Sequence, residues 1–165
     1  MTFLSPSIIV ALATCGRIGY MGKAPGTNGA AVGLIAFILL YYSVYGVSPI
    51  AYSIIVGLIT AMAIWVCGRA EVLLKERDPS VVILDEIVAL PFCFLGLDGM
   101  LQSGQAWWLL ILGFVLFRFF DIVKPWPINP LQRLPGGWGV VVDDLAAGLA
   151  TTFTLHLLLF MVALF

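Results

Sequence analysis

The feature that most constrains this chain is an uncharged stretch from Ala24 to Gly68. It is more than twice as long as the roughly 20 apolar residues that cross a bilayer as one helix. The stretch is interrupted at residues 46–49, which read Gly-Val-Ser-Pro. Because Ser48 can cap a helix and Pro49 suits the first helical position, the stretch predicts two membrane-spanning helices joined by a tight turn.

The composition extends this conclusion to the whole chain. Of the 165 residues, 62% are hydrophobic and 10% are charged, whereas soluble domains have about 45–50% and 25%. The net charge is −1, so the chain lacks the basic excess of a nucleic-acid-binding protein and we expect no nucleic-acid partner. At about 20 residues per span, the length allows at most five or six helices and no separate soluble domain. We therefore expect one membrane-embedded domain over residues 1–165.

Three further apolar segments complete an expected set of five spans: Pro79–Leu97, Gly104–Val123 and Gly139–Phe165. The first of them follows Asp78, a candidate cap, and contains Pro91, so we expect a kink in it. Residues 5–20 are a shorter, interrupted stretch that predicts an interfacial or half-inserted helix. Gly29-x-x-x-Gly33 in the first span is typical of helix packing. The expected fold class is an all-α, polytopic membrane helical bundle.

The basic residues give the expected orientation of this bundle. With five spans, all eight Lys and Arg residues fall on one side of the membrane, and the turns at 46–49 and 98–105 contain none of them. By the positive-inside rule, that side is cytoplasmic. The N-terminus is then inside and the C-terminus outside.

The acidic residues follow the same asymmetry, with Asp98 alone on the opposite side. Glu71, Glu76 and Asp78 lie among basic residues at the end of a span, where we expect a solvated charge cluster. The other five acids lie inside apolar segments and are Asp85, Glu86, Asp121, Asp143 and Asp144. An ionised carboxylate at mid-membrane costs about 2.5–3.5 kcal/mol, so these five need a compensating partner.

Two kinds of partner are available to the five carboxylates. Arg118 and Lys124 lie three residues before and after Asp121, so ion pairs on one helix face can neutralise that residue. A hard divalent cation such as Mg²⁺ takes carboxylate oxygens and keeps water molecules for a substrate phosphate. The acidic pairs at 85–86 and 143–144, with Asp121, could surround one or two such ions. Scattered structural ion pairs are the alternative.

The segments beside these acids suit a phosphate group. Lys124 begins a stiff Lys-Pro-Trp-Pro segment at the expected interface, and the glycine-rich residues 136–139 lead into the last span. Pro25–Gly29 opens the first span, where free N–H groups favour an anion, although Thr27 or Asn28 could equally be a plain helix cap. Cations for phosphate and carboxylates for metal, together at the bilayer surface, favour metal-assisted phosphoester chemistry on a lipid headgroup.

Several segments of the chain also combine in a specific order and spacing. They are Pro25-Gly26-Thr27, Asp78-Pro79-Ser80, Asp85-Glu86, Arg118-Phe-Phe-Asp121-Ile-Val-Lys124-Pro-Trp-Pro127, Gly136-Gly137-Trp-Gly139 and Val142-Asp143-Asp144-Leu-Ala-Ala-Gly148. Together they resemble the phosphatidylglycerophosphatase A family over residues 16–155. Two positions depart from the family pattern, since Ala89 replaces an expected glycine and Lys23 an expected small or apolar residue. These departures bear on substrate range more than on reaction class.

The resemblance implies a Mg²⁺-dependent phosphatase of the bacterial inner membrane, with its active site on the cytoplasmic side. Its anionic phospholipid substrate would be phosphatidylglycerophosphate, which loses its terminal phosphate to give phosphatidylglycerol and inorganic phosphate. The catalytic centre, with one or two metal ions, is expected at Asp85, Glu86, Asp121, Asp143 and Asp144. The substrate phosphate is expected at Arg118 and Lys124, with Lys23 and Thr27 nearby.

Two other function classes are alternatives to a lipid phosphatase. A cation channel or transporter could use the same acids as an ion path, but transport sites lie near the midplane between repeats, and here the acids gather at one membrane face. A lipid phosphotransferase that joins an alcohol to a nucleotide-activated lipid would need D-G-x-x-A-R followed by spaced aspartates. The sequence lacks that pattern.

Overall fold

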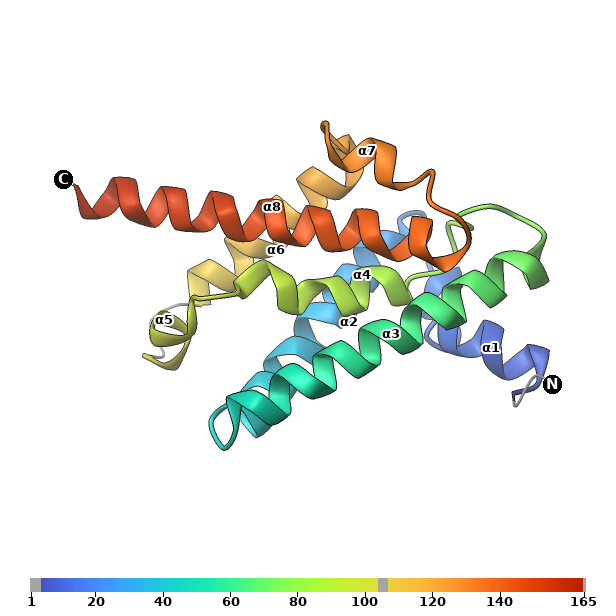
Figure 1. Ribbon diagram of the computed structural model, residues 1–165, viewed down its shortest axis with the longest axis horizontal. Helices are drawn as coiled ribbons and strands as arrows, with labels where there is room; N and C mark the ends of the chain where they lie inside the picture. The colour runs from blue at the N-terminus through green and yellow to red at the C-terminus, as the bar shows by residue number, and fades with distance from the viewer. Residues whose placement is uncertain (1–3, 104–106, 165) are drawn as a thin grey trace.

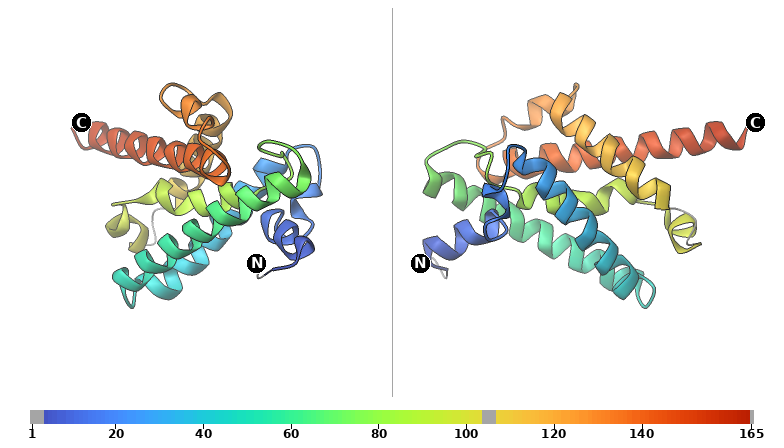
Figure 2. Two further views of the ribbon diagram at one scale, coloured as in Figure 1. Left: turned by 45° about the vertical axis from the view of Figure 1, so that its right-hand side comes forward. Right: turned by 180° about the vertical axis from the view of Figure 1, so that it is seen from behind.

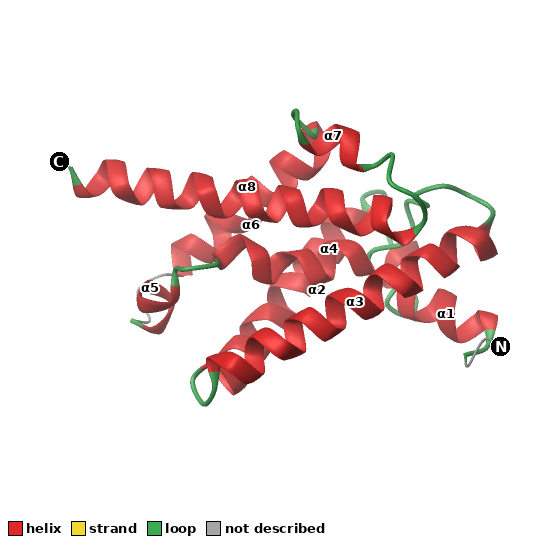
Figure 3. Ribbon diagram, viewed as in Figure 1, coloured by secondary structure: helices red, strands yellow, loops and turns green. Residues whose placement is uncertain are grey.

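The computed structural model describes residues 4–103 and 107–164, and every regular element in them is helical (Figures 1 and 3). The long helices are α2 (Pro25–Leu40), α3 (Pro49–Leu74), α6 (Trp107–Val123) and α8 (Gly137–Ala163). The short helices are α1 (Pro6–Ala13), α4 (Leu84–Ala89), α5 (Asp98–Gln102) and α7 (Ile128–Leu131). Tighter or wider helical turns are η1 (Ile18–Tyr20), η2 (Tyr41–Tyr45) and η3 (Leu90–Phe94). The all-α expectation is confirmed for the described residues.

Three helices are long and apolar enough to cross a membrane: α2 with its extension to Tyr45, α3 and α8. These agree with three of the five expected spans, and α8 begins two residues earlier than expected. α6 has 17 residues, and positions 104–106, where its span was expected to begin, lie outside the described residues. The expected span at Pro79–Leu97 is not one long helix.

That expected third span is built from shorter pieces. Residues 79–83 are not helical, and α4 begins without a side-chain cap. The expected cap at Asp78 is therefore wrong, and Asp78 instead adopts a left-handed φ of 48°. α-Helical geometry ends at Ala89, and η3 continues through Pro91 as a 3₁₀ turn. Because proline has no N–H to donate to the preceding turn, the expected break at Pro91 is present.

α2 and α3 both begin with a proline, but only α3 has a side-chain cap. At the turn into α3, Ser48 Oγ accepts a first-turn backbone N–H at 3.2 Å, and Pro49 is the first helical residue, as expected. At the start of α2, Ala24 is the cap residue, and Pro25 occupies the first turn. The alternative in which Thr27 or Asn28 is a plain cap of this helix is therefore wrong.

α4 lies at the centre of the bundle, and longer helices surround it (Figures 1 and 2). It packs against α2, α3 and α8, while α6 packs against α8 and α2. Most residues of α4 and η3 are buried, and Ala89 and Leu90 are fully so. The short central helix is therefore enclosed by protein, which allows its first turn to carry polar side chains that lipid would exclude.

Two glycines let α2 approach α4 at backbone distance. A Cβ atom at Gly33 would lie 2.8 Å from Ile87 Cα, and one at Gly29 would lie 2.8 Å from Ile83 Cβ and from Glu86 Oε2. Separations this short are not tolerated by side chains, so the contact requires glycine. The packing role expected for Gly29-x-x-x-Gly33 is confirmed, and its effect is to hold Glu86 against the start of α2.

The loops that carry most of the basic residues gather in one half of the molecule. Residues 14–24, 75–83 and 124–136 lie in the right-hand half of Figure 1. The turn between α2 and α3, helix α5 and the C-terminus lie in the left-hand half. α1 is also on the right, where it packs against α3. Whether α1 is interfacial or half-inserted stays a prediction.

The close contact of α2 with α4 makes a testable prediction. Gly33→Ala should destabilise the protein by about 1–3 kcal/mol, because the added methyl group meets the α4 backbone and cannot be relieved by a rotamer change. Gly57→Ala in α3 is the matched control, since a methyl group there would meet no packed neighbour within 4 Å. Thermal unfolding in detergent should show a lower Tm for Gly33→Ala alone. Equal Tm values for both variants would contradict the packing argument.

Candidate metal centre

The five buried carboxylates expected from the sequence come together from three helices. Asp85 and Glu86 lie in the first turn of α4, Asp121 near the end of α6, and Asp143 and Asp144 in the second turn of α8. Their exposed fractions range from 1% to 8%. Packing of α8 against both α4 and α6 brings the three pieces into one place.

Three of these acids form a tight cluster. Asp85, Glu86 and Asp144 each offer an oxygen atom, and these three atoms lie within 4.8 Å of one another. Asp85 Oδ1 and Glu86 Oε2 are buried and have no hydrogen-bond partner among the described residues. Buried polar atoms are nearly always satisfied in native proteins. Three carboxylates at this spacing, two of which carry an unsatisfied oxygen, fit a hard divalent cation such as Mg²⁺.

The remaining acids are neutralised by the two basic residues. Arg118 Nη1 donates to Asp121 Oδ2 at 2.5 Å and lies 3.7 Å from Glu86 Oε1. Lys124 Nζ donates to Asp143 Oδ2 at 2.5 Å and lies 3.6 Å from Asp121 Oδ1. The expected pairing of Asp121 with both cations is confirmed. Ion pairs thus account for two of the five acids.

The cluster of three is left with little compensation. Within residues 4–103 and 107–164, neither Asp85 nor Asp144 has a basic partner within 4.0 Å, and Glu86 has only the 3.7 Å contact with Arg118. Burial of several carboxylates without matching positive charge is strongly unfavourable. The ion-pair alternative therefore does not account for this part of the site, and a bound cation would.

Lys124 is held in place by an unusual backbone conformation. It follows the last residue of α6 with φ at 44°, and its backbone N–H donates to Phe120 O at 2.8 Å. The left-handed conformation costs roughly 1–2 kcal/mol in a residue with a side chain. Burial by itself would lower the pKa of the Lys124 ammonium, but the carboxylates of Asp144 and Asp143 raise it above its usual range. The side chain is therefore a fixed cation.

A cavity of about 290 Å³ opens onto these side chains. Its lining includes most of the acids and both cations expected at the site: Asp85, Glu86, Arg118, Asp121, Lys124 and Asp144. Gly26 lines it as well, and a Cβ there would collide with Glu86 Oε1 and lie 3.0 Å from Arg118 Nη1. The cavity thus presents carboxylates and cations together to one small ligand.

Some expected residues lie outside this cavity, and some unexpected ones line it. Lys23 and Thr27 are exposed and are not among its lining residues. Asp143 is behind the cavity, where it holds Lys124. Asp78 and Ser80 do line it, although the sequence indicated a solvated charge cluster at Asp78. The Asp78-Pro79-Ser80 motif was the feature of the sequence that could have indicated these two lining residues.

Comparison with known proteins adds independent information. The sequence model of a family described as Phosphatidylglycerophosphatase A matches residues 11–159. A Bacteroides thetaiotaomicron protein, provisionally named a phosphatidylinositol-3-phosphatase, is 35% identical over 79% of this chain and 80% of its own. Proteins named phosphatidylglycerophosphatase A from Haemophilus influenzae and Escherichia coli are 30% and 28% identical, over 79% and 80% of this chain and 76% and 72% of theirs. No solved structure matches the chain.

The acidic cluster predicts a metal-dependent gain in stability. Mg²⁺ at about 100 times its Kd should stabilise the folded protein by about 2.7 kcal/mol, measured as a higher Tm than in EDTA. Asp144→Asn should lose most of this gain, yet should not lower Tm in EDTA, because it removes a buried carboxylate that has no basic partner within 4.0 Å among the described residues. Glu76→Gln, at an exposed position, should respond as the wild type does. An undiminished Mg²⁺ effect in Asp144→Asn would contradict the assignment.

Proposed function

The chain belongs to the phosphatidylglycerophosphatase A family, and from this premise we propose that it removes the terminal phosphate of phosphatidylglycerophosphate in a Mg²⁺-dependent reaction. Membership makes the protein a phosphatase; the substrate, the metal and the residue roles are the proposal. The observation that carries it is the buried cluster of Asp85, Glu86 and Asp144 beside two cations in one cavity. The products are phosphatidylglycerol and inorganic phosphate.

In this proposal the three clustered carboxylates hold the metal. Asp85 and Glu86 from α4 and Asp144 from α8 would be its protein ligands, and a second ion would draw on Asp121 as well. Bound Mg²⁺ would polarise the phosphoryl oxygens and lower the pKa of a metal-bound water molecule, which makes that water a better nucleophile. These carboxylates are at most 8% exposed, and the low effective dielectric constant around buried groups strengthens electrostatic interactions at the site.

Arg118 and Lys124 bind the phosphate in this arrangement. Their side chains are 16% and 18% exposed, so each reaches the cavity while keeping its carboxylate partner. Asp121 contacts both cations and orients them, and Asp143 anchors Lys124 from behind. Fixed cations stabilise the negative charge that the phosphoryl oxygens carry in the transition state.

We also propose that the chain crosses the bacterial inner membrane five times, with this site at the cytoplasmic surface. The segment from α4 through η3 runs from the half of the molecule with the basic loops toward α5 in the other half, which supports a crossing there (Figure 1). α6 supports another. Loop residues 24, 78–80 and 124 line the site cavity, so the site is at the end of the bundle with the basic loops.

The position of the site also bears on the channel or transporter alternative. Transport sites lie near the midplane, between repeats. Here the cavity is lined partly by loops, and α4 and η3 bury apolar residues beyond Glu86, including Leu90, Cys93 and Phe94. An apolar core below the acids does not favour an ion path.

The first test is phosphate release by the detergent-purified protein. With Mg²⁺, we expect release from phosphatidylglycerophosphate to exceed release from phosphatidic acid and from phosphatidylinositol 3-phosphate, and EDTA should abolish it. The second comparison lipid follows from the name of the Bacteroides relative. Preferred release from either comparison lipid would overturn the substrate assignment. No release from any lipid, with ion flux in liposomes, would favour the transport alternative.

The second test separates the roles of the acids. Asp144→Asn should lower kcat/KM at least about 100-fold, because it removes a metal ligand, and Asp121→Asn should lower it about 10- to 100-fold through loss of orientation of the two cations. Both variants should stay folded by size-exclusion chromatography and thermal unfolding. Glu76→Gln is the charge-matched control and should retain wild-type turnover. Wild-type turnover in Asp121→Asn and Asp144→Asn would contradict the site assignment.

A further inference from the structure

A second polar cavity, of about 280 Å³, adjoins the metal centre. Its lining consists of five residues from the loop after α3 and from the region of α7: Arg77, Asp78, Asn129, Gln132 and Arg133. Asp78 also lines the metal-centre cavity, so the two cavities meet at that residue. None of the five lining residues is apolar, unlike the surroundings of a lipid chain.

Two guanidinium groups in this cavity are not matched by carboxylate partners. Arg77 follows α3 and Arg133 follows α7. In the part of the chain that the structure describes, every ion pair involves Arg118 or Lys124, so neither arginine is paired. Arg77 Nη2 donates to Gln132 O at 2.8 Å, which fixes this side chain across the gap between the two loops. Its other N–H groups remain available to a ligand.

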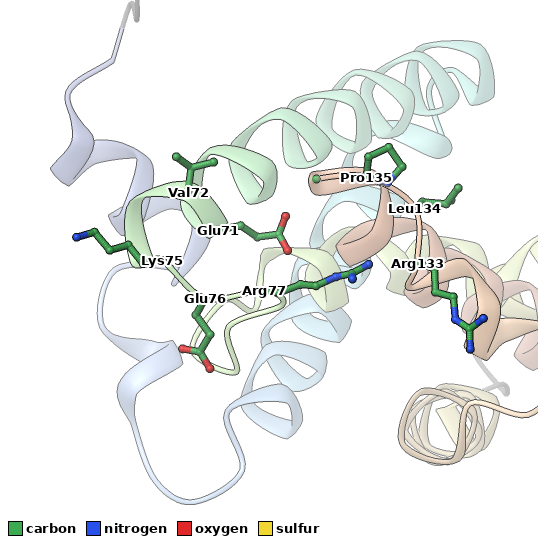
Figure 4. Close-up of a pocket in the computed structure, with 9 residues that line it drawn as sticks. Glu71, Val72, Lys75, Glu76, Arg77, Arg133, Leu134 and Pro135 are labelled. Carbon is green, nitrogen blue, oxygen red and sulfur yellow. The ribbon is translucent and has the colours of Figure 1, made fainter.

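The same two arginines also line a larger cavity of about 490 Å³, which we call the outer cavity (Figure 4). Lys75 adds a third positive charge there, while Glu71 and Glu76 add negative ones. Glu71 is already engaged, because its Oε1 accepts the backbone N–H of Asp78 at 2.9 Å. Arg77 and Arg133 therefore line both the outer cavity and the smaller cavity that meets the metal-centre cavity at Asp78.

We propose that Arg77 and Arg133 form a second phosphate-binding site, separate from the metal centre. Guanidinium groups bind phosphate oxygens through paired N–H donors, and the side-chain amides of Asn129 and Gln132 offer further donors. Asp78 is the one acid in the lining, so the two guanidinium groups outnumber it. The ligand is a phosphate dianion, either free inorganic phosphate or the phosphomonoester of a lipid headgroup.

The position of the site suits release of the product phosphate, and this role rests on the proposed function. The two products differ in where they can go, because the lipid stays in the bilayer and inorganic phosphate must reach water. The row of three cavities, joined at Asp78 and then at Arg77 and Arg133, leads from the metal centre to the outer cavity. Inorganic phosphate would bind at the two arginines on its way out.

Binding of inorganic phosphate to the purified full-length protein in EDTA tests the site without turnover and without divalent metal at the carboxylates. Titration followed by ³¹P NMR should detect binding to the wild type. Arg77→Gln and Arg133→Gln should each weaken it about tenfold, or about 1.4 kcal/mol. Lys75→Gln is the matched control, since it removes the same charge from the same loop but lines only the outer cavity. Its affinity should equal that of the wild type.

Unchanged affinity in both arginine variants, or an equal loss in Lys75→Gln, would overturn the proposal. Because Arg77 also bridges two loops, Arg77→Lys serves as a second variant that keeps the charge and should bind more tightly than Arg77→Gln. Repeating the titration with phosphatidic acid in micelles distinguishes the two sources: arginine-dependent binding of the lipid alone assigns the site to a headgroup, and arginine-dependent binding of inorganic phosphate assigns it to the free ion.

The same measurements separate this site from the proposed function. Asp144→Asn should bind inorganic phosphate in EDTA as the wild type does, because Asp144 does not line the smaller cavity. If the wild type released no phosphate from any lipid but bound inorganic phosphate through Arg77 and Arg133, the proposed function would fail and the second site would stand.

Discussion

The structure depends on how it compensates a group of carboxylates buried where three helices meet. Two of the acids are neutralised by the chain of contacts that runs from Arg118 through Asp121 and Lys124 to Asp143. The other three lie close together, and among the described residues Asp85 and Glu86 each keep a buried oxygen without a hydrogen-bond partner. Because buried, unpaired charge is so unfavourable, the surrounding helices must be held rigidly enough to keep this arrangement, and a divalent cation is the partner that its geometry suits.

Close backbone approaches provide that rigidity. Glycines of α2 bring its first turns against α4, which places Glu86 beside Arg118. At the start of α8 a similar contact occurs with α3, where a Cβ at Gly68 would lie 2.6 Å from Gly137 N. This contact fixes the first turn of α8, and the next turn carries Asp143 and Asp144. The acids are therefore positioned by small residues that have no chemical role of their own.

In the proposed function, the charges of the site divide into acids that would hold the metal and cations that would bind the phosphate, and Asp121 contacts both cations. Both cations keep a carboxylate partner while they face the cavity, so they are held without being withdrawn from a ligand. Beyond Asp78, the neighbouring cavity is lined by Arg77 and Arg133, which have no ion-pair partner in the part of the chain that the structure describes. The position of all these groups at one end of the bundle suits a substrate whose phosphate is at the membrane surface and whose chains remain in the bilayer.

The sequence by itself determined the helical class, the turn at Ser48 and Pro49, the break at Pro91 and the identity of the five buried acids, because these follow from local hydropathy, capping and the cost of charge in an apolar segment. It also indicated the pairing of Arg118, Asp121 and Lys124, which are neighbours on one helix face. Only the tertiary structure decided that Asp143 pairs with Lys124 while Asp144 joins Asp85 and Glu86, and that Asp78 lines the cavity whereas Lys23 and Thr27 do not. Those outcomes depend on how separate helices rotate and approach one another, and the sequence pattern of a single helix carries no information about that.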